Sequence, residues 1–152
     1  MKRIVLIFFA LFSLIKISNA QYIFQKLYNY NNYFNDVGFC VIQTLDNGYI
    51  SVGNTVNAND GTYIVKTNEK GDTIWTKFYD FCLPAGDEAT TIIQLADSTF
   101  IIGGWYVDTI EGSRDSYLLK LNTLGDTLWF ITIDVGHNDR IIMLKQINDN
   151  EF

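Results

Sequence analysis

A short phrase recurs along the chain and constrains the fold more than any other feature. The segments 43–49, 94–100 and 146–152 share the pattern Gln-x-x-Asp-x-x-Tyr/Phe, and their first residues lie 51 and 52 positions apart. Repeats of roughly 20–50 residues are typical of solenoids and propellers, because each unit buries its apolar face against the next. The sequence therefore predicts a tandem-repeat architecture.

Each repeat is predicted to form four β-strands. Apolar and β-branched runs are separated by turn signals such as Asn47-Gly48, which tolerates the positive φ of a tight hairpin. The counterparts of 63–66 lie 54 residues on instead of 51, so we expect three extra residues in the connection between the second and third strands. The predicted strands are 39–45, 49–53, 63–66 and 73–79 in the first unit, and 90–95, 100–104, 117–120 and 127–129 in the second.

Four antiparallel strands per unit favour propeller blades over a solenoid, whose units contain fewer elements. The segment 24–28 matches 75–79 at the same offset of 51, so a lone fourth strand is expected ahead of the first unit. Propellers use such a strand to complete another blade, which removes open sheet edges. The predicted fold class is all-β, with four-stranded antiparallel meanders as β-propeller blades in an incomplete ring.

The predicted organisation has five parts. Two blades with fragments of two others do not close a ring, which needs roughly four to eight blades. We therefore expect a piece of a longer protein or a truncated product, whose partners are the remaining blades or other copies of itself. The parts are a signal peptide at 1–20, a lone outer strand with its connection at 21–37, a first blade at 38–80, a second blade at 81–135 and the start of a third at 136–152.

The first twenty residues have the features of a secretory signal. Lys2 and Arg3 precede an apolar run at 4–15, and Ala20 ends a small-residue cleavage site. The run is shorter than the about 20 apolar residues that a spanning helix needs, so no membrane span is expected. Cleavage after Ala20 predicts a secreted or cell-surface protein.

The charge of the mature chain narrows its range of partners. Loss of Lys2, Arg3 and Lys16 leaves 8 basic and 17 acidic residues, a formal charge of −9. Because an acidic surface repels phosphate backbones, nucleic acid is not an expected partner.

Four sequence elements recur in both units. They are the Gln-x-x-Asp-x-x-Tyr/Phe hairpin, the strand ends at Gly53 and Gly104, the Tyr-x-x-Lys strand and the Asn-x-x-Gly-Asp-Thr-x-Trp turn. In these elements, which span most of 22–152, the chain resembles the secreted bacterial tandem-repeat β-propeller proteins. Members of that group often carry a C-terminal sorting domain, which the 152 residues do not include. The Gly-x-x-x-Trp elements at 71–75 and 125–129 are also similar to the tryptophan-docking motif of quinoprotein-type propellers.

The cysteines and the single histidine form no recognisable site. Cys40 and Cys82 occupy non-equivalent repeat positions, and the sequence is compatible both with a bridge and with two separate thiols. They belong to no CxxC pair or Cys/His cluster that would suggest zinc. His137 lies in a predicted loop without a nucleophile motif nearby, so a solvent-exposed loop histidine is favoured over a general base.

Three aspartates recur where the innermost strands begin. Asp36, Asp87 and Asp139 each precede a recurring glutamine by seven residues. A ring of carboxylates could hold a hard cation such as Ca²⁺. The alternative, which we favour, is that each aspartate accepts backbone hydrogen bonds in its turn.

The recurring tryptophans and glutamines also have two interpretations. Trp75 and Trp129 could stack on sugars or wedge between neighbouring blades, and recurrence at one position favours the wedge. Gln43, Gln94 and Gln146 are likewise interpreted as hydrogen-bonding residues between blades and not as ligands.

Two function classes follow from the sequence. The first is a secreted non-catalytic β-propeller that binds or scaffolds protein or glycan through the variable segments 54–62 and 105–115. Trp105, Tyr106 and Arg114 are its candidate binding residues, because aromatic residues and Arg dominate binding hot spots. The alternative is part of a propeller enzyme, quinoprotein-like or hydrolytic, whose site lies on other blades. No cofactor is evident, and no catalytic residue is assigned.

Overall fold

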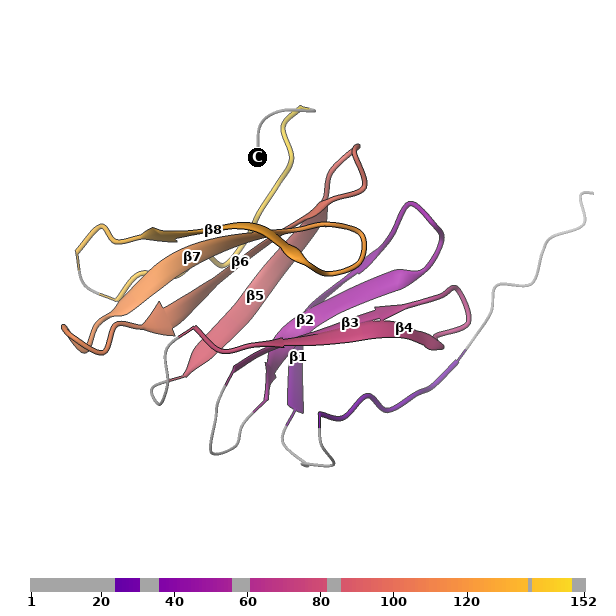
Figure 1. The fold of residues 1–152 in the computed structure, drawn as a ribbon, viewed down its shortest axis with the longest axis horizontal. Helices are drawn as coiled ribbons and strands as arrows, with labels where there is room; N and C mark the ends of the chain where they lie inside the picture. Colours follow the sequence, from indigo (N-terminus) through magenta and orange to yellow (C-terminus); the bar gives the residue numbers. More distant parts are fainter. Residues whose placement is uncertain (1–23, 31–35, 56–60, 82–85, 137, 149–152) are drawn as a thin grey trace, which may run out of the picture.

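The structure, a computed structural model, describes residues 24–30, 36–55, 61–81, 86–136 and 138–148. Within these ranges the chain forms two four-stranded antiparallel sheets and no helix, which confirms the all-β prediction (Figure 1). No helix in the described ranges is long and apolar enough to cross a membrane. The predicted signal peptide at 1–20, Cys82 and His137 lie outside the described residues.

The strands follow one another in each sheet in chain order, as a meander requires. We name the two sheets sheet 1 and sheet 2. Sheet 1 contains β1 (Asp36–Gln43), β2 (Tyr49–Thr55), β3 (Gly61–Thr67) and β4 (Thr73–Tyr79), and sheet 2 contains β5 (Asp87–Gln94), β6 (Phe100–Val107), β7 (Arg114–Leu121) and β8 (Thr127–Ile133).

The predicted hairpin turns are confirmed. Asn47 adopts a φ of 65° between β1 and β2, and Ser98 adopts a φ of 67° at the equivalent point between β5 and β6. The turns between the third and fourth strands place Gly71 and Gly125 at φ values of 77° and 79°. These left-handed conformations are the reason that Gly and Asn recur in the turn signals.

Three extra residues were predicted in the connection between the second and third strands of the second unit. The corresponding connection of sheet 1, residues 56–60, lies outside the described residues. In sheet 2, β6 and β7 each have 8 residues, and the last pair of that hairpin is Val107 with Arg114.

The first strand of each sheet contains a β-bulge opposite a recurring glycine. The register of β1 shifts between Gly38 and Cys40, and that of β5 shifts between Ala89 and Thr91. A Cβ atom on Gly104 would lie 2.0 Å from the carbonyl oxygen of Glu88. The glycine at the strand end is therefore required by the close approach of the bulged backbone.

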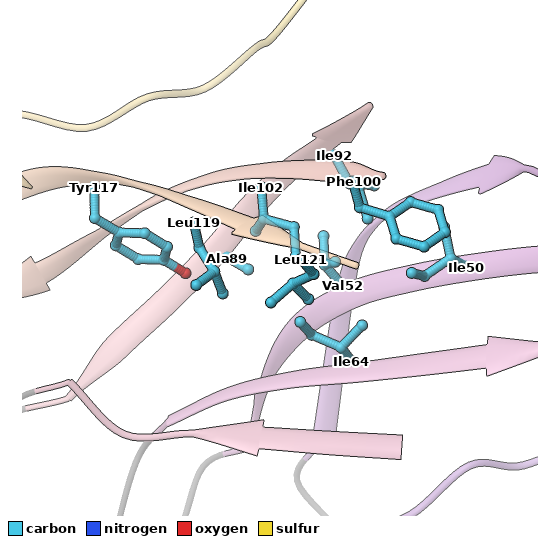
Figure 2. Packing of buried hydrophobic residues seen from close by; sticks show 10 residues of the cluster. All are labelled: Ile50, Val52, Ile64, Ala89, Ile92, Phe100, Ile102, Tyr117, Leu119 and Leu121. Carbon is cyan, nitrogen blue, oxygen red and sulfur yellow. The ribbon is translucent and has the colours of Figure 1, made fainter. Parts of the chain in front are cut away.

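The main core lies between the two sheets, where β5 packs against β1, β2 and β3 (Figure 2). Sheet 1 and sheet 2 both contribute, and the buried side chains are Ile50, Val52, Ile64, Ala89, Ile92, Phe100, Ile102, Tyr117, Leu119 and Leu121. A second cluster of Leu95, Ile101 and Leu118 lies on the opposite face of sheet 2, against Ile141 and Leu144. Each sheet therefore buries side chains through alternation along its strands.

Two flanking segments pack on the sheets without forming strands. Residues 24–30, predicted to be a lone fourth strand, are assigned no strand and lie beside sheet 1. Residues 138–148, predicted to begin a third unit, contain a single β-bridge residue, Asn148. Neither segment is one of the strands of the two sheets that the described residues form.

Candidate functional site

Two of the three candidate binding residues meet at one end of sheet 2. The Arg114 guanidinium carbon lies 4.5 Å from the centroid of the Trp105 ring, a cation–π geometry. On the neighbouring strand, Glu88 accepts a 3.3 Å hydrogen bond from Nε1 of Trp105. Arg114 is exposed, whereas Trp105 and Glu88 are half-buried. We name these three residues the Trp105 cluster.

The register of the β6–β7 hairpin creates this arrangement. Trp105 pairs with Ser116 and Val107 pairs with Arg114, so Arg114 is a diagonal neighbour of Trp105 on the same face. The backbone of Arg114 is fixed by the C-terminal segment, since its N–H donates to Oδ1 of Asn138 and its carbonyl accepts from the N–H of Asp139 at 2.6 Å.

Tyr106, the third candidate, belongs to the opposite face. Its ring packs against the main core, and its hydroxyl lies 3.4 Å from Oδ2 of Asp115. Burial is the largest influence on the Tyr106 hydroxyl, and its pKa is raised from the ordinary value. Alternation along the strand could have separated Tyr106 from Trp105 in the sequence.

Glu88 was missed by the sequence reasoning. It lies directly across the ladder from Trp105. Neither Trp105 nor Glu88 matches its counterpart in sheet 1, where Asn54 and Val37 occupy the equivalent positions. This departure from an otherwise regular repeat was the available signal.

The three recurring aspartates each accept a backbone hydrogen bond, as the favoured interpretation expected. Asp87 accepts from the N–H of Thr62 at 2.7 Å and from that of Phe81 at 2.9 Å. Asp36 accepts from Tyr30 at 2.7 Å, and Asp139 accepts from Val135 at 3.0 Å.

The same three carboxylates do not belong to a common cluster of possible metal ligands. In the described part of the chain, no group of three or more His, Cys, Asp or Glu side chains is arranged to hold a metal ion. Cys40 on β1 is half-buried and forms no disulfide with any residue that the structure describes; Cys82, its candidate partner, is not among them.

Asp87 is the most strongly buried of these carboxylates, with 1% of its surface exposed. Burial raises its pKa to about 6, against the hydrogen bonds from Thr62 and Phe81, which lower it. Because Thr62 belongs to β3, this carboxylate joins sheet 2 to sheet 1. Thr62 also joins the sheets through its hydroxyl, which lies 2.8 Å from that of Tyr117.

The recurring tryptophan in sheet 1 is a wedge between sheets. Nε1 of Trp75 donates to the carbonyl of Thr123 at 3.1 Å, and an edge of its ring lies beside Gly125, where a Cβ atom would come within 3.1 Å of Cη2. Tyr79, on the same strand, donates to the carbonyl of Gly125 at 2.6 Å. Trp75 therefore packs between sheet 1 and sheet 2, and its role as a wedge between neighbouring blades stays a prediction. Trp129 packs against the second cluster on the far face of sheet 2.

Two recurring motifs pair with one another inside each sheet. Lys66, from the Tyr-x-x-Lys strand, contacts Asp46, from the hairpin phrase, at 2.8 Å. In sheet 2, Lys120 contacts Asp97 at 3.6 Å. Burial alone would raise the pKa of Asp46. The hydrogen bonds from Lys66, Thr44 and Gly48 outweigh burial and lower this pKa to about 2. These motifs are structural.

The recurring glutamines lie at the end of the sheets opposite the Trp105 cluster. Oε1 of Gln94 accepts from the N–H of Leu45 at 2.8 Å, which confirms a hydrogen-bonding role between repeats. Gln94 and Gln146 help to line a shallow hollow of about 420 Å³, together with Leu45, Leu95, Ala96, Ile147 and Asn148. Nε2 of Gln146 donates to the carbonyl of Asn148 at 3.0 Å.

No protein-family model matches this chain, and no curated protein matches it either.

Proposed function

We propose that this chain is part of a secreted, non-catalytic β-propeller protein and that it binds protein or glycan through the Trp105 cluster. The observation that carries the proposal is the Arg114–Trp105 stack, held from one side by Glu88. Aromatic residues and Arg carry much of the energy at binding surfaces, and a preformed pair loses less side-chain freedom on binding.

The different roles of recurring and non-recurring residues support the Trp105 cluster as the binding site. Residues that recur, such as Trp75, Asp87 and Gln94, make the contacts between one repeat and the next. The members of the Trp105 cluster do not recur, so the repeat contacts do not account for them. Two four-stranded meanders packed face to face are the arrangement that adjacent blades would adopt. The enzymatic alternative stays a prediction.

Binding arrays test the proposal. The mature chain, residues 21–152, is labelled and applied to a glycan array and to a peptide array. We expect at least one probe to bind, and Trp105→Ala or Arg114→Ala to weaken that binding by about tenfold or more.

Ile110→Ser is the matched control, because Ile110 lies in the same hairpin connection and is 92% exposed. It should bind as the wild type does. Absence of binding on both arrays, or wild-type binding by both alanine variants, would contradict the proposal.

A further inference from the structure

The face of sheet 1 that points away from sheet 2 is the counterpart of the buried face of sheet 2. Ile92 of β5 is 2% exposed beneath sheet 1, whereas its counterpart Val41 of β1 is 63% exposed. The same comparison holds for the start of the strand, where Ala89 is buried in the core and Gly38 is exposed. We name this region the open face of sheet 1.

The outer part of the open face is already filled by residues 24–30. Tyr28 donates to the carbonyl of Gly71 at 2.7 Å, just as Tyr79 of β4 donates to that of Gly125 at 2.6 Å. Tyr30 packs on Tyr63 of β3 with ring centroids 5.5 Å apart, as Phe81 packs on Tyr117 of β7 at 5.0 Å. Lys26 pairs with Asp72 as Lys77 pairs with Asp126. Residues 24–30 therefore reproduce the contacts of a fourth strand and the residues that follow it.

The part of the open face against which the third strand of another sheet would pack is not occupied by any strand of the described residues. At the sheet interface, Oδ2 of Asp87 accepts from Phe81 and Oδ1 accepts from the third-strand N–H of Thr62. Asp36 repeats half of this pattern, since its Oδ2 accepts from Tyr30. Its Oδ1 is buried and has no hydrogen-bond donor among the residues that the structure describes.

Asp36 also lines a groove in the open face. The groove has a volume of about 130 Å³, and its walls include Tyr28, Gly38, Tyr63 and Val65. A buried carboxylate oxygen without a donor costs free energy, and an N–H placed in this groove would remove that cost.

We propose that the open face of sheet 1 binds a three-stranded β-meander of this same repeat pattern, which donates a third-strand backbone N–H to Oδ1 of Asp36. The continuity with the interface between sheets 1 and 2 identifies this occupant. A second copy of the chain fits less well, because its complete sheets would bring a fourth strand to the place that residues 24–30 occupy. The inference rests on the repeat architecture of the proposed function and is independent of its binding cluster.

An extended chain tests the proposal. Residues 36–72 are placed directly before residues 22–152, so that the added β1–β3 copy continues into 24–30 at the natural repeat spacing. The reference is a chain carrying a scrambled 36–72 segment of identical composition. We expect the true extension to raise Tm above the scrambled reference by about 5 °C or more.

Asp36→Ala and Asp87→Ala then locate the contact. In the extended chain, Asp36→Ala should lower Tm by about 5 °C more than it does in residues 21–152, because two N–H groups lose their acceptor instead of one. Asp87→Ala should lower Tm equally in both chains, since its partners are present in each.

A separate measurement tests the proposal in the event that the extended chain does not fold. A peptide of residues 49–67 is titrated into isotope-labelled residues 21–152, and amide shifts confined to the open face and lost in Asp36→Ala support the proposal. Equal stability of true and scrambled extensions, or equal Asp36→Ala effects in both chains, overturns it. Absence of peptide shifts with an unfolded extension also overturns it, as does a dimer of residues 21–152 in which Val41 becomes protected from hydrogen exchange.

Discussion

Replacement of Asp87 by Asn should change how the stability of this protein depends on pH. The carboxyl is 1% exposed, and burial raises its pKa from 3.8 to about 6. Between these two values the folded state keeps a proton that the unfolded chain releases. The contribution of Asp87 to stability is therefore complete below about pH 4 and is lost as the pH rises through about 6.

The size of this pH effect on stability follows from the shift in the pKa of Asp87. About two pKa units correspond to about 3 kcal/mol, which is the upper limit for the loss in the free energy of unfolding between pH 4 and pH 7. Asp87→Asn removes the titration. Asn also places an amide against the N–H of Phe81 or Thr62, so a pH-independent cost of about 1–2 kcal/mol is expected.

Urea unfolding of both proteins at half-unit steps from pH 4 to pH 7 measures the prediction. The unfolding free energy of wild type minus that of Asp87→Asn should fall steadily as the pH rises, from about 1–2 kcal/mol at pH 4 to negative values near pH 7. Asp46 does not interfere, because its pKa of about 2 places its own contribution at lower pH and it is present in both proteins. Parallel curves for the two proteins would refute the reasoning.

Two further substitutions test the contacts between and within the sheets. Trp75→Ala should lower the free energy of unfolding by about 2–4 kcal/mol, because it removes the ring packed against the main core and the hydrogen bond to Thr123. Ile74→Ala, at the 55% exposed neighbouring residue, should cost under about 1 kcal/mol in the same urea titration. Gly104→Ala should cost about 2 kcal/mol or more, because its Cβ would lie 2.0 Å from a backbone oxygen, and Gly38→Ala, with no atom within 4 Å of its Cβ, is the control. A Gly104→Ala protein as stable as Gly38→Ala would rule out the close approach as the reason for the recurring glycine.

The strands and turns were predictable from the sequence because their signals are local. Alternating apolar residues and the Asn47-Gly48 turn act within a few positions, and the repeat presents each signal twice. The structural use of Gln94 and Trp75 could also be inferred, since identical packing at each junction explains their recurrence.

The candidate site was only partly predictable because it depends on register. Trp105 and Arg114 were identified by residue type, but their stacking requires the pairing of Val107 with Arg114 in the β6–β7 hairpin. The repeat spacing showed how many residues the second unit adds and not which residues of the hairpin would pair. Glu88 lies on another hairpin strand, and its role could be seen only once the ladder was known.

The β-bulge in β5 changes which residues of the strand face sheet 1, from odd-numbered residues before the bulge to even-numbered residues after it. Asp87 and Ala89 lie before the bulge and Ile92 lies after it, yet all three face sheet 1. Without a bulge, simple alternation along the same residues would place Ile92 on the face opposite Asp87 and Ala89. The extra residue, Thr90, thus keeps the carboxylate that contacts sheet 1 and the core residue Ile92 on one face of the strand.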